Sequence, residues 1–482
     1  MTSFSYNIST EVPSSYVKTL LDFIYVQYLF PQAKKYSQFS QKQVEGVPVL
    51  SYIVLDNNLR SALEVEIKGN IPLELTLTPL IEGLSGKLIE LTKQDLVIAI
   101  QVFEEKSRKR TLYFAWREGE KIIPETLRKE EKSLKRLLFE TQLLFFLLIT
   151  TLTMFLFYFI SFNRPDLLWV APLIIILVPF VIVFFSSNII SRNADWTITQ
   201  KNPYIHILTY HLPLDYFKNF NQIPNKQQKL QIKKEIFAEI LSKKGEIDCI
   251  SASKILQKHN ISCAPENLLS KKINVYDLVK QTAVRFGFPL PKIMVSNTMA
   301  PNAATSGPSP SRGLVLITTG LLVQLEKEEI ISVLGHEFGH LKGRDPLLLY
   351  FITSGEFLFR YYILLPLFPF LFSPFIFIAY FWITMVIIFF IGKFFEARAD
   401  LTSAQEIGNP SALAAALEKI GFKKLLYERA SSFRIQEWLG LDPHPPIYFR
   451  INRLRKLDTS KKVKHLLTQS IKDVFKGFIE TL

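Results

Sequence analysis

VLGHEFGHLKGRD (Val333–Asp345) is the stretch that most restricts what this chain can fold into and do. It holds two of the seven histidines, His336 and His340, with Glu337 beside the first. On a helix, side chains four residues apart project from the same face. Two imidazoles at this spacing can bind one zinc ion at roughly 2.0–2.1 Å, and the adjacent carboxylate can act as a base toward a zinc-bound water. The simpler alternative is a pair of histidines on a helix surface.

The surroundings of the motif support a packed helix. The amphipathic sequence LVQLEKEEIISVL (322–334) precedes it. Gly335 and Gly339 are unfavourable in an isolated helix. They therefore predict that a neighbouring helix or strand approaches closely at these positions.

A third ligand is needed, because a catalytic zinc site normally has three protein ligands and a water. The best downstream candidate is FFEARAD (394–400). Glu396 and Asp400 lie one helical turn apart, so they can supply a ligand and a carboxylate that orients a ligating histidine. Taken alone, this cluster is better described as the solvent-exposed start of a helix.

Long apolar runs predict a membrane protein. The uncharged runs 141–162 and 167–190, separated by NRPD, are each long enough to cross a hydrocarbon core of roughly 30 Å. The block 346–395 fits a second hairpin broken at Pro366, Pro369 and Pro374. Within it, Glu356 and Arg360 are spaced to pair on a helix. Four membrane spans are therefore expected.

Charge and composition agree with a membrane partner. The 482 residues include 57 Lys+Arg against 43 Asp+Glu, a net charge of +14, and 40 phenylalanines. Nucleic-acid binders rarely carry such long apolar runs, so no nucleic-acid partner is expected. The two cysteines, Cys249 and Cys263, are interpreted as reduced, and the N-terminus lacks a signal-peptide pattern. By the positive-inside rule, the basic residues that flank both hairpins place the soluble parts in the cytosol: Arg128, Lys129, Lys132, Lys135, Arg136, Arg192, Lys201, Lys342, Arg344, Lys393 and Arg398.

The remaining patterns predict a β-rich start and a mixed middle. Strands are expected at 63–69, 73–78, 96–103, 111–116, 291–297 and 313–320, and helices at 226–245 and 275–288. The C-terminal stretch 461–482 carries an apolar helical stripe, which could lie on a membrane or pack against the soluble part. That stripe consists of Val463, Leu466, Leu467, Ile471, Val474, Phe475 and Phe478.

Several motifs together resemble the M48 family of membrane zinc metallopeptidases, which includes HtpX-type proteases and Ste24-type CAAX proteases. They are HEFGH (336–340), GRD (343–345), a membrane hairpin, EARAD (396–400) and DPHPPIYFRINRL (442–454). PKIMVSNTMAPNAATSG (291–307) also resembles the family's Pro-Lys and Asn-Ala segments. The resemblance covers residues 270–457. The insert GPSPSRG (307–313) departs from the family pattern, and residues 1–127 have no counterpart.

The resemblance implies a role for each matching residue. His336, His340 and Glu396 would bind Zn²⁺, and Glu337 would be the general base. Asp400 would orient a ligating histidine, and His444 would support the oxyanion, although His-Pro-Pro alone indicates only a rigid turn. Arg450 would hold that segment against the active-site helices. Substrate would bind as an added β-strand beside Asn302 and beside the strand whose first residues are Gly313, Leu314 and Val315. The sequence of an ordinary hairpin strand would look the same as that of a substrate-binding strand.

The predicted fold is α+β. It is a mainly helical, gluzincin-type metalloprotease domain with a short sheet, two transmembrane hairpins and an N-terminal β-rich domain. The expected division of the chain is a β-rich domain of unknown role (1–127), a basic segment with the first hairpin (128–190), a first protease part (191–345), the second hairpin (346–395) and a second protease part with an amphipathic C-terminal helix (396–482).

The predicted function is a multi-pass zinc metalloendopeptidase, most simply of a bacterial cytoplasmic membrane. It would cut membrane or misfolded membrane-associated proteins, with its active site toward the cytosol. One alternative is a CAAX-type protease for prenylated proteins, which would need more spans around a chamber. Another is a catalytically weak metal-binding scaffold that recruits clients through residues 1–127. The oligomeric state and the natural substrate are left open.

Overall fold

The structure of the chain is a computed structural model. Most of the run 141–162, the basic cluster 128–136, Arg192 and Cys263 lie outside the part of the chain that it describes. The described residues are 3–56, 60–119, 155, 159–160, 162–167, 169–191, 194–212, 224–243, 245, 247, 249–259, 261, 264–429, 431–458 and 462–482.

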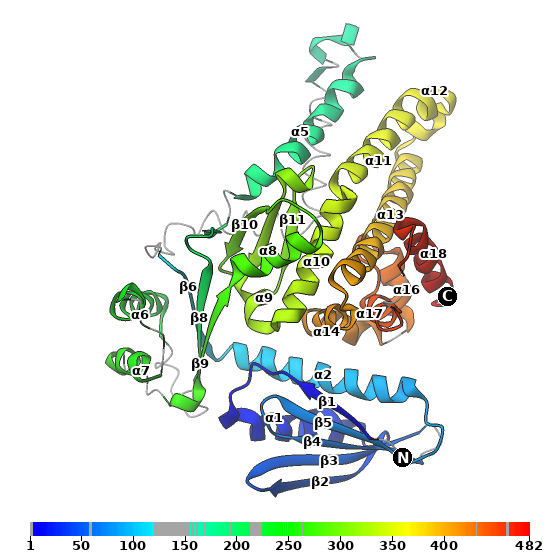
Figure 1. The fold of residues 1–482 in the computed structure, drawn as a ribbon. Helices are drawn as coiled ribbons and strands as arrows, with labels where there is room; N and C mark the ends of the chain where they lie inside the picture. The colour runs from blue at the N-terminus through cyan, green and yellow to red at the C-terminus, as the bar shows by residue number, and fades with distance from the viewer. Residues whose placement is uncertain are drawn as a thin grey trace.

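The N-terminal sheet has five antiparallel strands in the order β1-β5-β4-β3-β2, and α1 and α2 pack against it (Figure 1). The predicted strands at 63–69 and 73–78 are confirmed as β4 and β5. The elements are β1 (Phe4–Ile8), α1 (Val17–Phe23), β2 (Tyr36–Val44), β3 (Val47–Leu55), β4 (Ser61–Lys68), β5 (Leu73–Pro79) and α2 (Gly86–Arg108).

The strand predicted at 96–103 is wrong, because these residues lie inside helix α2. Leu96 and Ile100 belong to the core under the N-terminal sheet, whereas Ile98 belongs to the core of the helical unit on the other side. A helix buried on two sides is apolar nearly all round. It therefore loses the helical period that would distinguish it from a buried strand.

The second sheet joins segments from both sides of the first apolar region. Its order is β6-β8-β9, all antiparallel, with Arg117 of β6 opposite Ile205 of β8. Helices α6 and α7 pack on one face of it. The predicted strand at 111–116 and the helix within 226–245 are confirmed. The elements are β6 (Thr111–Arg117), β8 (Tyr204–His211), α6 (Lys226–Glu239), α7 (Cys249–Lys258) and β9 (Leu268–Asn274).

The third sheet has the order β11-β12-β10-β7. Strand β12 runs parallel to β10 and antiparallel to β11, which leaves β11 at the edge. The strands predicted at 291–297 and 313–320 and the helix predicted at 275–288 are confirmed. The elements are β7 (Trp196–Ile198), α8 (Val275–Arg285), β10 (Lys292–Ser296), β11 (Ala303–Ser306), β12 (Leu314–Thr318) and α9 (Thr319–Gln324).

Helices α10 (Lys327–Gly343) and α13 (Pro374–Ile407) cross at the two glycines of the histidine motif. A Cβ on Gly339 would lie 2.9 Å from the Cα of Ala399, and one on Gly335 would lie 2.6 Å from Ile407. The close helix approach predicted at these positions is thus confirmed. Four further helices, α14 (Pro410–Ile420), α15 (Phe422–Glu428), α16 (Ser431–Leu439) and α17 (Ile447–Arg455), pack around this crossing.

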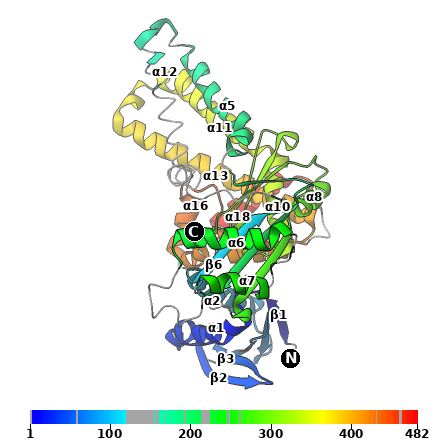
Figure 2. The same cartoon turned by 90° about the vertical axis from the view of Figure 1, so that its left-hand side faces the viewer.

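Three helices of the described chain are long and apolar enough to cross a membrane: Ala171–Asn188 within α5 (Ala171–Ser191), Asp345–Leu367 and Pro374–Ile407. They project together, away from the N-terminal sheet (Figures 1 and 2). The block 346–395, predicted as the second hairpin, contributes to two of these apolar helices. Helix α11 (Asp345–Phe359) continues through a π-helical turn to the short α12 (Leu365–Leu367), and Pro374 begins α13. Arg360 and Glu356 form the expected ion pair at 3.1 Å.

The described chain is therefore mainly helical, with three sheets and apolar helices that can span a membrane. The last helix, α18 (Leu466–Ile479), packs along α13. This agrees with the interpretation of the C-terminal stripe as a packing surface, but some of the stripe stays exposed, as described below.

Candidate metal centre

Helix α10 begins at a polar network that fixes the position of the histidine motif. The backbone N–H of Glu326 donates to Glu329 Oε2 at 2.8 Å, which satisfies a group left free at a helix start. The buried Lys419 donates to the same oxygen at 2.8 Å. The motif follows on this helix, with His336 buried and His340 half-buried.

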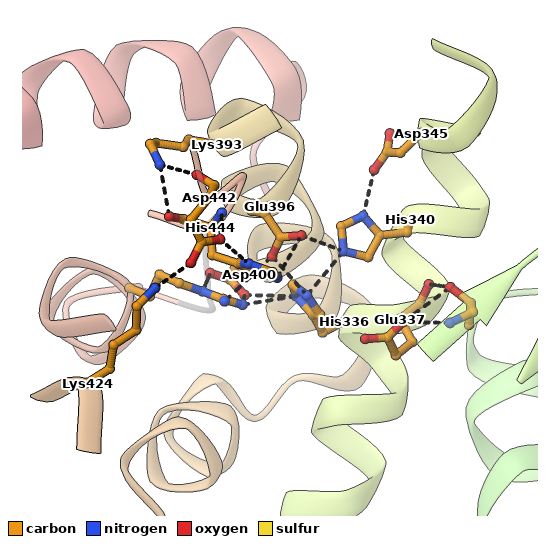
Figure 3. A network of polar contacts seen from close by, with 12 residues as sticks. His336, Glu337, His340, Asp345, Lys393, Glu396, Asp400, Lys424, Asp442 and His444 are labelled. Carbon is orange, nitrogen blue, oxygen red and sulfur yellow. Dashed lines mark hydrogen bonds and ion pairs between the residues drawn. The ribbon is translucent and has the colours of Figure 1, made fainter. Parts of the chain in front are cut away.

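Glu396 of α13 meets His336 and His340 in a three-residue group (Figure 3). The two Nε2 atoms are 3.2 Å apart, His340 Nε2 is 3.3 Å from Glu396 Oε1, and His336 Nε2 is 3.4 Å from Glu396 Oε2. Within the described part of the chain, no other group of three His, Cys, Asp or Glu residues converges in this way.

The spacing of these atoms fits a bound divalent cation. Ligands held at about 2.0–2.1 Å in tetrahedral geometry lie about 3.3 Å from one another. The three separations of 3.2, 3.3 and 3.4 Å agree with that value. Glu396 Oε2 is also buried without a hydrogen bond of normal geometry, and its nearest charged neighbour besides His336 is Arg450 Nη1 at 3.5 Å.

The other ring nitrogen of each histidine faces a carboxylate. His336 Nδ1 lies 2.9 Å from Asp400 Oδ1, and His340 Nδ1 lies 2.8 Å from Asp345 Oδ2. Because a carboxylate accepts hydrogen bonds, each Nδ1 carries the hydrogen and each Nε2 presents its lone pair to the centre. Two lone pairs at 3.2 Å repel each other unless a cation lies between them.

The electrostatics of the centre favour positive charge. Burial alone would lower the pKa of His336, but the neighbouring carboxylates of Asp400 and Glu396 raise the pKa above the ordinary value. Burial likewise acts to lower the pKa of His340, and the charge of Glu396, with a contribution from Glu337, raises it. The site therefore stabilises a cation, whether proton or metal.

Arg450 of α17 connects the group to the C-terminal helices. Its guanidinium donates to both oxygens of Asp400, at 2.9 and 2.7 Å, and lies 3.4 Å from His336 Nδ1. Both partners are buried. The pair thus holds the carboxylate that orients His336, and the charge of Asp400 raises the pKa of Arg450 against the opposing effect of burial.

His444 lies at the rim of the group, with its side chain 42% exposed and its Nε2 3.5 Å from Glu396 Oε1. Asp442 fixes its orientation, because Asp442 Oδ1 accepts from the backbone N–H of His444 at 2.9 Å and lies 2.7 Å from its Nδ1. Lys424 donates to the other oxygen of Asp442 at 2.6 Å. The charges and hydrogen bonds from His444 and Lys424 outweigh burial and lower the pKa of Asp442 below its ordinary value.

A buried lysine holds the same segment from the other side (Figure 3). Lys393 of α13 has no exposed surface, and its amine donates to the backbone carbonyls of Asp442 and His444. Gly392 makes room for this contact, because a Cβ there would lie 2.8 Å from Pro443. The position of His444 therefore depends on the end of α13 that also carries Glu396.

Glu337 does not belong to the three-residue group and is held by β11 instead. The backbone N–H of Thr305 donates to Glu337 Oε2 at 2.9 Å, and Thr305 Oγ1 donates to the carbonyl oxygen of Glu337 at 3.0 Å. The carboxylate that the sequence predicts as the base thus lies between the group and an edge strand.

The predicted substrate strand needs a correction. Strand β12, which contains Leu314 and Val315, lies between β10 and β11, so both of its edges are already hydrogen bonded. Both side chains are buried, and Gly313 precedes the strand. Asn302 is exposed and begins the turn into β11. The edge strands of this sheet are β7 and β11, and of these it is β11 (Ala303–Ser306) that contacts Glu337.

Comparison with known proteins agrees with this geometry. Residues 270–458 match the family model of peptidase family M48. The chain is 30% identical over 220 residues to a protein named Protease HtpX homolog from Caldanaerobacter subterraneus subsp. tengcongensis, which covers 38% of this chain and 71% of that protein. It is also 30% identical over 217 residues to the Protease HtpX homolog of Pyrococcus furiosus, with 38% and 73% covered. The homolog of Thermococcus sibiricus is 31% identical over 225 residues, with 38% and 73% covered.

The chain belongs to peptidase family M48. As an HtpX-like member with apolar helices long enough to span a membrane, it is a membrane metallopeptidase. The matched region of this M48 peptidase contains every residue named above at the candidate centre. The N-terminal sheet and the strands β6 and β8 lie before it, whereas most of β9 lies inside it.

Some residues around the centre were not singled out by sequence reasoning. Asp345 was quoted only as part of a motif, and Thr305, Lys393 and Asp442 received no role at the site. Asp442 carried a detectable signal, since an aspartate two residues before a histidine can accept a hydrogen bond from that histidine's backbone N–H. For Lys393 the signal was a charge inside an otherwise apolar helix, which is costly unless the charge has a partner.

Proposed function

We propose that this M48 peptidase is a zinc endopeptidase that cuts membrane proteins or misfolded membrane-associated proteins on the cytosolic side. The single observation that supports it most is the convergence of His336, His340 and Glu396, with both imidazoles oriented by carboxylates. Two nitrogens and one oxygen form a donor set of the kind found in catalytic zinc sites, which keep a fourth position open.

The three ligands would hold the zinc, and the neighbouring side chains would perform the proton transfers. Zinc held there would lower the pKa of a bound water to about 7 and would polarise the scissile carbonyl. Glu337 accepts a proton from the attacking water and returns it to the leaving amine. The hydrogen bond from Thr305 N–H holds this carboxylate in place.

His444 stabilises the charge that develops on the carbonyl oxygen. Its Nδ1 is bonded to Asp442, which leaves Nε2 at the rim of the centre, 3.5 Å from Glu396 Oε1, on the side where the reacting carbonyl would lie. Arg450 and Asp400 act one layer further out, because they orient His336 and do not touch the substrate. Substrate backbone adds to the free edge of β11, next to Glu337.

Two observations support a cytosolic active site. The paired strands β6 and β8 flank the first apolar region, so both ends of that region return to the same side of the membrane. Basic residues at the ends of the second hairpin, Lys342, Arg344 and Arg398, favour the cytosol as that side. The location proposed is the cytoplasmic membrane.

Cleavage by the purified full-length chain in liposomes tests this proposal. Zinc-loaded wild type should cut casein and a misfolded membrane protein, whereas Glu337→Gln should retain zinc and cleave at least about 10³-fold more slowly. Glu328→Gln, an exposed residue in the first turn of the same helix, is the matched control and should cleave like wild type. If wild type binds zinc but cleaves no faster than Glu337→Gln, the protein is a metal-binding scaffold and the proposal is wrong.

A further inference from the structure

The C-terminal helix α18 has a fixed orientation on the body of the protein. Its buried face consists of Ser470, Val474 and Gly477. A Cβ on Gly477 would collide with the ring of Phe449, and Trp438 donates through its indole N–H to Thr481 Oγ1 at 3.1 Å. These contacts determine which side chains of α18 point outward.

An apolar stripe next to that buried face is open to the surroundings. Phe475 is 46% exposed, Ile479 66% and Leu482 73%. Phe475 and Ile479 are four residues apart, so they lie on one side of the helix, and the half-buried Ile471 extends the same side by one turn. Leu482 follows the end of the helix, where its N–H still donates to the carbonyl of Phe478. Packing against the soluble part therefore accounts for only one face of the amphipathic pattern.

The stripe continues the apolar surface of α13. The Phe475 ring lies 5.6 Å from that of Phe390 and 5.5 Å from that of Phe394, between ring centroids. One turn before Phe390, Ile387 is 53% exposed on the candidate membrane span, and Ile383 is 54% exposed. In Figure 1, α18 lies beside the part of α13 that emerges toward the soluble domain. The exposed side chains of α18 thus begin beside the middle of this candidate span.

Basic residues border the stripe. Lys472 and Lys476 are exposed and follow Ile471 and Phe475 by one residue, which puts them on the side of the stripe away from the buried face. Glu480, one turn after Lys476 and 3.9 Å from its ammonium, follows Ile479 by one residue and so points about 100° away from it around the helix. Lysines beside an apolar stripe are typical of a helix that lies in the plane of a membrane with anionic lipids.

We propose that α18 is an interfacial helix, with Phe475, Ile479 and Leu482 inserted at the boundary between headgroups and acyl chains and Lys472 and Lys476 in contact with anionic lipid headgroups. This inference needs α13 to span the bilayer and does not depend on the catalytic proposal. Trp438, against which α18 packs, lies a few residues before His444. The bilayer would therefore support the segment that carries His444.

Two neighbouring positions on α18 allow a matched test by fluorescence quenching. Single cysteines at Ile479→Cys and Glu480→Cys, in a background with Cys249→Ser and Cys263→Ser, are labelled with an environment-sensitive dye. The full-length protein is placed in nanodiscs that contain lipids with a nitroxide near the headgroup. Because consecutive side chains of a helix point about 100° apart, quenching should be stronger at 479 than at 480.

The charge requirement is tested in the same samples. Replacing phosphatidylcholine partly with phosphatidylglycerol should increase the quenching at 479, and the double variant Lys472→Gln/Lys476→Gln should remove most of that increase. Unchanged thermal melting of the labelled chains shows that they remain folded. Equal quenching at 479 and 480 would overturn the proposal. So would a dye at 479 that is shielded from aqueous iodide but not quenched by lipid, because another protein surface would then cover the stripe.

Discussion

Lys393 is a fully buried lysine whose amine serves the backbone of the His444 segment. A buried ammonium is costly unless it is well hydrogen bonded. The amine donates to the carbonyls of Asp442 and His444. These two hydrogen bonds offset the cost of burial, and they also fix the position of His444 relative to Glu396. Lys393 is thus a positioning residue and does not reach the reacting atoms.

Replacing Lys393 should therefore affect turnover more than substrate binding. Lys393→Met is expected to lower kcat about 10- to 100-fold and to change KM by about twofold at most, because His444 would lose its alignment while β11 stays intact. The control is Lys423→Met, an exposed lysine with a side chain 62% accessible, which should behave as wild type. Steady-state kinetics with a quenched-fluorescence peptide measures both constants. An equal loss of zinc and of kcat in Lys393→Met would instead mean that this lysine supports the metal group.

At the scale of elements, the crossing of α10 and α13 decides whether the centre exists. The histidines come from one helix and Glu396 from the other, and the helices can approach this closely only because Gly339 has no side chain. The obstacle to a side chain at this position is the backbone of Ala399, which cannot rotate away as a side chain could. Adding a single methyl group at Gly339 should therefore disturb the arrangement of His336, His340 and Glu396.

Gly339→Ala is expected to destabilise the protein by about 1–3 kcal/mol and to weaken zinc binding. Gly355→Ala is the matched control, since a Cβ at that helical position meets nothing within 4 Å. The control should be neutral or slightly stabilising, because alanine favours a helix over glycine by about 1 kcal/mol. Thermal melting in detergent and zinc titration would test both. Equal melting temperatures for the two variants would contradict the close crossing.

The elements that could be predicted from sequence are those with one buried face. Strands β4 and β5 alternate apolar and polar residues and were predicted, and the second hairpin was predicted from its prolines and length. Helix α2 was missed because two cores bury it from both sides. At the site, the three ligands follow from spacing and resemblance, whereas the partners of their Nδ1 atoms depend on how separate helices pack. The sequence also did not predict that β11 is the edge strand, because β11 and β12 are similar short strands.

At the scale of the whole molecule, α2 connects the N-terminal sheet to the helices behind the candidate centre. Arg455 of α17 pairs with Glu418 at 2.7 Å and with Glu90 of α2. Lys419 donates both to Ser9 and to Glu329, at 2.8 Å each, and so connects the N-terminal strand region to the start of α10. Most of these contacts join charged groups. The docking of the N-terminal sheet should therefore depend on pH and on salt concentration.

One buried carboxyl in this region predicts a pH dependence of stability. Burial and the charge of Glu11 raise the pKa of Glu104 to about 7, although hydrogen bonds from Thr10 and the charge of Arg108 act in the opposite direction. Because the folded pKa lies above the unfolded value of about 4.5, the stability that Glu104 contributes is complete below pH 4.5 and is lost as the pH rises through 7.

Thermal melting between pH 5 and pH 8 tests this linkage. The melting temperature of wild type should fall more over this range than that of Glu104→Gln, which cannot ionise. Glu105→Gln removes a neighbouring surface carboxylate and should keep the wild-type slope. A Glu104→Gln profile parallel to wild type would show that Glu104 does not titrate in this window.

Zinc K-edge X-ray absorption on the zinc-loaded chain tests the central claim, that α10 and α13 build one zinc centre. Glu337→Gln is the protein of choice, because it should bind metal without turnover. We predict one zinc per chain, coordinated by two imidazoles, one carboxylate oxygen and one further light atom, and a loss of one protein oxygen ligand together with weaker binding in Glu337→Gln/Glu396→Gln. An unchanged spectrum and affinity in the double variant, or no stoichiometric zinc in Glu337→Gln, would contradict the account.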